Sequence, residues 1–273
     1  MNVLSKFTCI SLIALVLAGC AGTADKTASP KGVAAPAKDS VEAIFKEARE
    51  EIEANGWQRA IELYEKVQSL DALGVYGRQA LVDTAFAQWR NGEPAIALTT
   101  LDRYLRLFPK SDGTAYALYL KGLINFNERS GLFAKFSGED LSERDPKQLR
   151  EAYDVFQRLV KDYPDSKYAP ESTQRLRYIV NTLAQHEVGI ALYYLQRNAP
   201  VAAINRAQDL LKQFADTPAQ EEALGIMIEG YRQLGMLDLK ADAEKVLSKN
   251  YPKSRHLSGA TYTRPPKSFF ALW

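Results

Sequence analysis

The sequence predicts an all-α protein, a solenoid of about five helical hairpins, and three observations carry this prediction. The segment 92–111 recurs at an offset of 106 residues and, from Ala97 onward, at an offset of 55, with apolar residues at the same places. In each copy these residues lie three and four positions apart, which is the spacing of one face of an amphipathic helix. Several helices end in an aromatic residue followed by proline, which cannot continue a helix.

The copies share a small residue where the apolar stripe begins, at Ala97, Ala152 and Ala203, and this lets a neighbouring helix approach closely. The other repeated positions are apolar in every copy. They are Leu98, Leu101, Tyr104, Leu105 and Phe108; then Tyr153, Phe156, Leu159, Val160 and Tyr163; then Ile204, Ala207, Leu210, Leu211 and Phe214. Each aromatic-proline end is followed by a serine that we expect to cap the next helix, namely Ser111, Ser166 and Ser254.

Two glycines mark turns ahead of these helices. Gly92 precedes Pro109 by 17 residues, and Gly235 precedes Pro252 by the same number. A glycine turn, a small residue, an aromatic residue and a closing proline together resemble the tetratricopeptide repeat, whose period is about 34 residues. A single hairpin cannot bury its stripe alone. We therefore expect a right-handed solenoid with one concave face, a type of face that usually binds polypeptide.

Residues 1–19 are predicted to be a lipoprotein signal peptide. Lys6 supplies a positive start, and the apolar core that follows it, residues 7–18, is too short to span a bilayer. Leu17-Ala18-Gly19-Cys20 resembles the bacterial lipobox, which implies cleavage before Cys20 and acylation of that cysteine. The alternative is an ordinary signal peptide with a chance or buried cysteine.

A mature chain beginning at Cys20 would carry several acyl chains, and more than one chain gives stable membrane anchoring. An aspartate after the lipidated cysteine would imply retention at the inner membrane, but this chain has Ala21. We therefore expect a protein of the outer membrane, lipid-anchored on the periplasmic side. Cys9 leaves with the signal peptide, so no disulfide forms within the mature chain. Residues 20–39 are predicted to be a flexible tether of about 25 Å.

A helical repeat domain is predicted over residues 40–257. Ser40 is expected to cap its first helix, and residues 55–57 to form the first turn. The apolar stripes of the first two repeats are Val41, Ile44, Phe45, Ala48 and Ile52; Ala60, Ile61, Tyr64 and Val67; and Leu81, Ala85, Phe86 and Trp89.

The third repeat is irregular. After a helix that carries Leu120, Leu123 and Ile124, residues 127–145 form a loop long enough to suggest function or mobility. The next helix is expected to have Pro146 at its first position.

The remaining residues predict two further repeats. The segment 168–197 is expected to be helical, either as one long helix or as two with a break near His186. The fourth repeat continues from Pro200, and the fifth covers residues 221–250. Residues 258–273 are predicted to be an extended aromatic tail.

The composition excludes some classes of function. Lys plus Arg number 35 and Asp plus Glu number 33, a net charge of +2, whereas nucleic-acid binding needs clustered positive charge. Trp57, Trp89 and the tyrosines could form a stacking platform for bases, but at helical spacing they are more typical of a core. We therefore expect no nucleic-acid partner.

No catalytic or cofactor motif is present. His186-Glu187 lacks the second histidine of a zinc-protease helix, and the chain has only two histidines, so neither a metal site nor a cofactor is expected. An acid-base pair among Glu139, Asp140 and Glu143 would require burial. A Ser-His-Asp arrangement built from distant positions stays open, but the sequence predicts a protein that is not an enzyme.

The whole pattern resembles one family, the BamD (ComL) lipoproteins of the outer-membrane barrel assembly (BAM) machinery. The most specific similarities are residues 141–146 (Leu-Ser-Glu-Arg-Asp-Pro) and 200–206 (Pro-Val-Ala-Ala-Ile-Asn-Arg). The resemblance implies a scaffold that binds the periplasmic domains of BamA through its carboxy-terminal repeats. It also implies contact with other BAM lipoproteins, and with unfolded outer-membrane β-barrel proteins in an amino-terminal groove.

Arg206 matches a family arginine that contacts an acidic residue of BamA. It lies on the flank of the stripe that includes Ala203 and Ala207, so its guanidinium can reach outward to a carboxylate. The alternative is a solvated helix arginine. Many family members end the first repeat with an aromatic residue and proline, whereas this chain has residues 71–74 (Asp-Ala-Leu-Gly) there. We therefore assign no substrate contacts in the first repeat from the resemblance.

Two other functions remain open from the sequence. One is an adaptor lipoprotein for an envelope protease or for peptidoglycan synthesis, and the other is an envelope hydrolase. The proteins that co-purify from detergent would identify the first, and hydrolase activity that survives purification would identify the second.

Overall fold

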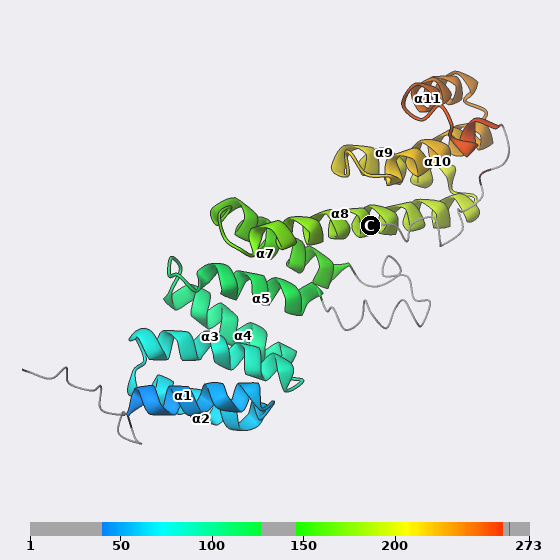
Figure 1. Cartoon of the computed structure of the whole chain (residues 1–273). Coiled ribbons are helices and arrows are strands. Elements are labelled where there is room, and N and C mark those ends of the chain that lie inside the picture. Colours follow the sequence, from blue (N-terminus) through cyan, green and yellow to red (C-terminus); the bar gives the residue numbers. More distant parts are fainter. Residues whose placement is uncertain (1–39, 127–145, 259–261, 263–273) are drawn as a thin grey trace, which may run out of the picture. The chain divides into compact units, whose positions relative to one another are not determined.

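The computed structural model describes residues 40–126, 146–258 and 262, and within them the chain is all-α (Figure 1). All of these residues belong to one unit that begins at Ala37. The helices are α1 (Val41–Glu53), α2 (Trp57–Leu70), α3 (Val75–Arg90), α4 (Pro94–Leu107), α5 (Thr114–Phe126), α7 (Lys147–Asp162), α8 (Ala169–Gln196), α9 (Pro200–Gln213), α10 (Ala219–Gln233), α11 (Leu237–Asn250) and the short 3-10 helix η2 (Arg255–Ser258). The predicted signal peptide, tether and long loop lie outside the described residues.

The helices pack in consecutive pairs, which confirms the prediction of helical hairpins. Within the described residues the pairs are α1 with α2, α3 with α4, α5 with α7, α8 with α9, and α10 with α11. Each hairpin also packs against the next one, through α2 and α3, α4 and α5, α7 and α8, and α9 and α10. Stacking of neighbours is what buries the stripe that one hairpin leaves exposed.

Helix α8 settles the choice between one helix and two for residues 168–197. It is continuous over 28 residues. Its interior glycine, Gly189, is less favourable in a helix than alanine by about 1 kcal/mol, but Val188 and Ala191 beside it are buried. Packing against α7, α9 and α10 along its length therefore keeps the helix unbroken.

Four hairpins share the same turn geometry. The residue two positions before the second helix has a positive φ in each of them: Asn55 at 61°, Gly92 at 88°, Asn198 at 57° and Gly235 at 70°. Glycine and asparagine are the residues that enter this left-handed region most readily. The two glycines were predicted as turn markers, and the two asparagines occupy the equivalent place in the other hairpins.

The predicted helix ends are confirmed, but the serine caps are only partly so. Four aromatic residues are the C-caps of α4, α7, α9 and α11: Phe108, Tyr163, Phe214 and Tyr251. Ser40 caps α1 as expected, because its hydroxyl accepts from the backbone N–H of Ala43 at 3.1 Å. Ser111 caps no helix. Its Oγ lies 2.8 Å from the hydroxyl of Tyr104, and α5 begins only at Thr114.

The expectation for Pro146 is wrong by one residue. The helix α7 begins at Lys147, so Pro146 is its N-cap residue and not its first helical residue. Proline suits either place, since neither position has an intrahelical partner for the missing N–H.

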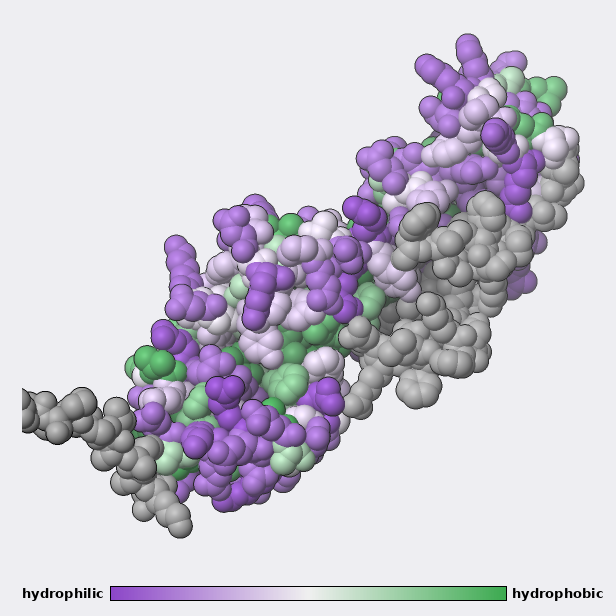
Figure 2. Space-filling view, in the orientation of Figure 1, coloured by the Kyte–Doolittle hydropathy of each residue, from purple (hydrophilic) through white to green (hydrophobic). Residues whose placement is uncertain are grey.

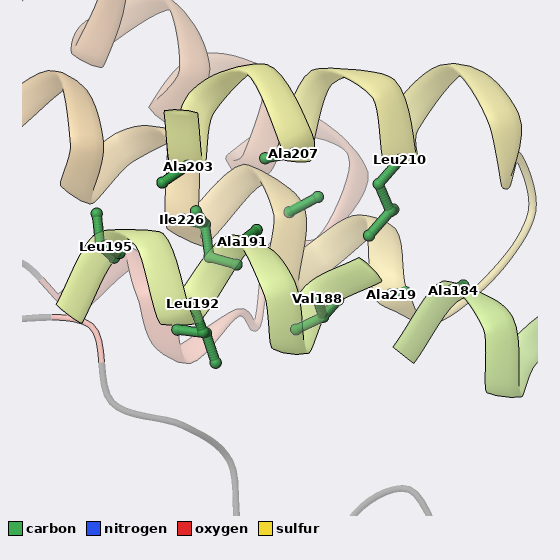
Figure 3. Close-up of a cluster of buried hydrophobic side chains, with 11 residues drawn as sticks. Ala184, Val188, Ala191, Leu192, Leu195, Ala203, Ala207, Leu210, Ala219 and Ile226 are labelled. Carbon is green, nitrogen blue, oxygen red and sulfur yellow. The ribbon is translucent and has the colours of Figure 1, made fainter. Parts of the chain in front are cut away.

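The small residues that begin the stripes lie in the core, as predicted. Ala97, Ala152 and Ala203 are fully buried. Figure 3 shows the cluster around Ala203, in which Ala184, Ala191 and Leu195 of α8 lie on the side toward Ala207 and Leu210 of α9, with Ile226 of α10 in the same cluster. Three helices thus share one core where hairpin four meets hairpin five.

Candidate functional site

Arg206 lies where the sequence placed it, on the exposed side of α9. Its neighbours Ala203 and Ala207 are buried, whereas 47% of the Arg206 side chain is accessible to solvent. The guanidinium Nη1 lies 3.4 Å from Oε2 of Glu187 on α8. Arg206 therefore reaches outward, but it also has a partner within the chain that sequence reasoning missed.

Glu187 pairs with a second arginine. Its other oxygen, Oε1, lies 3.6 Å from Nη2 of Arg150 on α7. Only 14% of the Glu187 side chain is exposed, against 60% for Arg150. One carboxylate on the middle helix therefore lies between arginines from the helices on either side of it, and hairpins three and four both contribute to this cluster.

Half-buried tyrosines form a second feature, between α5 and the start of α8. Tyr119 and Tyr168 stack with ring centroids 4.8 Å apart, and Tyr116 lies 5.5 Å from Tyr168. The Tyr119 hydroxyl donates to Glu171 at 2.6 Å, which lowers the pKa of that carboxyl, and Arg175 adds to the effect. The rings join two successive hairpins and keep part of their edges accessible.

The prediction that tyrosines belong to the core is confirmed for Tyr64 and Tyr104, each 1% exposed. The cluster of tyrosines at the surface was missed because Tyr168 follows Tyr119 by 49 positions in sequence. Figure 2 shows that most of the visible surface is hydrophilic and that apolar residues gather over α3 to α5.

Asp83 on α3 lies close to the tyrosines of the first repeats. Burial raises its pKa to about 6, although Gln79 donates to its carboxylate at 2.9 Å and Arg49 also favours the charged form. Burial, and then the charge of Asp83, raise the pKa of Tyr116. Since the ionised carboxylate of Asp83 is poorly solvated, it opposes folding at neutral pH.

Asp83→Asn is therefore expected to stabilise the protein at pH 7.5 by about 2 kcal/mol. The folded pKa lies above the unfolded value, so the cost of ionisation appears as pH rises through 4 to 6 and is complete above that range. Asparagine keeps an oxygen that can accept from Gln79. Urea unfolding at pH 7.5 and pH 4 measures the difference, which should vanish at the lower pH. A variant less stable than the wild type at pH 7.5 would contradict this assignment.

A cavity of about 400 Å³ opens between α4, α5 and α7. Leu105, Leu118 and Val155 form its apolar part, and Lys121 at its edge is paired with Asp102. The cationic and anionic side chains around it are nearly balanced, so it favours no particular charge of ligand.

A buried carboxylate contacts side chains that follow α11. Glu222 of α10 is 3% exposed and accepts from Arg255 at 3.1 Å and from the hydroxyl of Tyr262. His256 lies 3.3 Å from the same carboxylate and stacks on Tyr262, with ring centroids 4.8 Å apart. Arg255, His256 and Tyr262 thus contact the last hairpin.

The other predicted site residue, Cys20, lies outside the described residues. Within the part of the chain that the structure describes, no group of His, Cys, Asp and Glu is arranged to hold a metal ion. His186 is half-buried. The described helices include none whose length and hydropathy would let it cross a bilayer.

Comparison with known proteins gives a consistent result. The family model YfiO, described as an outer membrane lipoprotein, matches residues 37–247. The outer membrane protein assembly factor BamD of Neisseria meningitidis serogroup A is 39% identical over 251 residues, which cover 91% of this chain and 92% of that protein. BamD of Vibrio cholerae is 32% identical over 207 residues, or 76% and 86% of the two chains. The solved structure of MamA is 18% identical to this chain, with a TM-score of 0.33, and the match covers 83% of this chain and 98% of that protein.

Proposed function

Because the chain belongs to the YfiO family of outer membrane lipoproteins, which includes BamD, we propose that it is a scaffold of outer-membrane barrel assembly. It binds BamA and unfolded barrel proteins and brings them together for insertion. The proposal gives the protein no chemical step of its own. The observation that carries it is the match to BamD over nine-tenths of both chains.

The stacked hairpins suit this role. A row of helical hairpins exposes side chains from several repeats side by side, so an extended polypeptide can contact many of them at once. Tyr116 and Tyr119 of α5 and Tyr168 before α8 have rigid, partly apolar side chains that can form hydrogen bonds, which are useful properties for binding chains of varied sequence. We infer that unfolded barrel segments bind on this side of hairpins two to four.

The anchor is part of the proposal. Acylation of Cys20 would hold the protein at the outer membrane, on the periplasmic side, and residues 20–39 would connect the anchor to the helices. Such an anchor would keep this protein at the same membrane surface as the other BAM lipoproteins and the substrate.

Arg206 is proposed to contact BamA. Its exposed guanidinium has five N–H donors, and the Glu187 contact engages only one of its nitrogens. The remaining donors can bind a carboxylate on the periplasmic domains of BamA. The carboxy-terminal repeats are then the part of the scaffold that binds BamA.

Depletion of the protein from the bacterium that encodes it tests the function. Folded outer-membrane barrels are expected to fall severalfold, as measured by heat-modifiable mobility on gels, and to recover when the wild-type chain is supplied again. A Cys20→Ala chain should leave the membrane fraction. Unchanged barrel levels after full depletion would refute the function.

A further inference from the structure

The cluster around Glu187 contains two arginines, and we propose that both of them contact BamA. This proposal rests on the function proposed above. Arg150 of α7 and Arg206 of α9 form one surface for an acidic segment of BamA. Glu187 of α8 is a positioning residue that holds the two guanidinium groups side by side before the partner arrives.

The first support is the geometry. Both arginines reach the same carboxylate, one at each oxygen, at 3.6 Å and 3.4 Å. Their helices belong to different hairpins and flank α8. Two cations that share one carboxylate must lie close together on the same side of α8, although 56 positions separate them in sequence. A partner that contacts Arg206 therefore meets Arg150 as well.

The second support is the weakness of the contacts. Each arginine offers one nitrogen to Glu187 at a distance longer than the roughly 2.7–2.9 Å of a strong charge-assisted hydrogen bond. Arg232, by contrast, donates hydrogen bonds to Glu229 from two nitrogens, at 2.8 Å and 2.6 Å. The arginine ends of the two pairs are 60% and 47% exposed, so solvent screens each pair and its expected contribution is about 1 kcal/mol. Redirecting either guanidinium to a partner carboxylate is therefore inexpensive.

The third support is charge. Two guanidinium groups and one carboxylate leave a net charge of +1 on these three side chains, with most of the N–H donors unused. Such a surface attracts an acidic segment and can bind two carboxylates, one at each arginine. Glu187 is mostly buried and keeps the arginines from moving apart, which lowers the conformational entropy lost on binding.

Charge reversal of Arg150 provides the test. The full mature chain is titrated with the purified soluble periplasmic domains of BamA by calorimetry. Arg150→Glu is expected to weaken binding by about tenfold or more, as is Arg206→Glu, and both losses should shrink at high salt. Arg158→Glu is the matched control, since Arg158 is also on α7, 47% exposed and paired at 3.6 Å, but with Asp162. It is expected to change affinity less than about twofold.

Glu187→Gln tests the positioning role separately. Removing a negative charge alone would strengthen the binding of an acidic partner, whereas loss of positioning should weaken it severalfold. This weakening should disappear in a chain that also carries Arg150→Gln and Arg206→Gln. Tighter binding of the Glu187→Gln single variant would overturn the positioning role.

The outcomes separate the two levels of the proposal. If Arg206→Glu weakens binding while Arg150→Glu behaves like Arg158→Glu, the two-arginine surface is wrong and the function stands. If neither reversal matters, the surface on α7 to α9 is wrong, and the depletion experiment alone decides the function. If the wild-type chain does not bind the BamA domains, the surface and the proposed partner fail together. Circular dichroism and urea midpoints verify that each variant is folded.

Discussion

Replacing Phe156 by alanine is expected to lower the free energy of unfolding by about 3–5 kcal/mol. Phe156 is fully buried on α7, where it packs with Leu123 of α5 and Ile179 of α8. Its ring also covers Gly122, and a side-chain carbon at Gly122 would come within 2.4 Å of it. Helices α5 and α7 thus pack together with the Phe156 ring directly against the backbone of Gly122. Alanine at position 156 therefore leaves a cavity that the two helices cannot easily close.

Urea unfolding followed by circular dichroism measures this loss. Phe156→Leu retains most of the volume and should cost clearly less than alanine. Val201→Ala, at a residue that is 57% exposed, is a control with an expected change below about 0.5 kcal/mol. A loss below about 1 kcal/mol in Phe156→Ala would mean that this ring does not hold α5 and α7 together. Because hairpin three separates the first two hairpins from the last two along the chain, the unfolding transition is also expected to broaden as the stack loses cooperativity.

The sequence predicts the helices and their buried faces well because both follow from local spacing. The apolar stripes that begin at Ala97, Ala152 and Ala203 can each be recognised within a window of about a dozen residues. All three alanines are buried in the structure. Helix ends at an aromatic residue and proline are local as well. The positive φ of Asn55 and Asn198 was missed, because asparagine marks such a turn less clearly than glycine does.

The contacts of the candidate site could not be predicted in the same way. Helical spacing indicates that Arg206 is exposed, but Glu187 precedes it by 19 residues across a turn, and Arg150 belongs to another hairpin. The contacts of Glu222 bridge 33 and 40 residues. Such pairs depend on how neighbouring helices are rotated about their axes, and the period of a single helix does not determine that rotation.

Glu222→Gln is expected to weaken the attachment of Arg255, His256 and Tyr262 to α10 by about 3 kcal/mol. Burial alone would raise the pKa of the Glu222 carboxyl, but the contacts with His256, Tyr262 and Arg255 outweigh it and leave the pKa lowered. The carboxylate thus contacts three side chains beyond α11 at once. Gly225 adds to the fit, since a side-chain carbon there would come within 2.7 Å of the His256 ring. Glutamine has a similar shape, but it cannot supply the negative charge that Arg255 requires.

The pH dependence of the destabilisation distinguishes loss of the Glu222 charge from a change in packing. The folded pKa of Glu222 lies below the unfolded value of 4.5, so its stabilisation is complete above that pH and disappears as pH falls through the folded pKa. The difference in urea midpoint between wild type and Glu222→Gln should therefore be constant from pH 8 to pH 6 and shrink below pH 4.5.

Trypsin at pH 8 reports the local effect, since cleavage after Arg255 should become rapid in the variant alone. Glu221→Gln changes the neighbouring residue, which makes none of these contacts, and should leave both measurements unchanged. A midpoint difference that persists at low pH would show that the glutamine variant is destabilised by packing and not by loss of the ion pair.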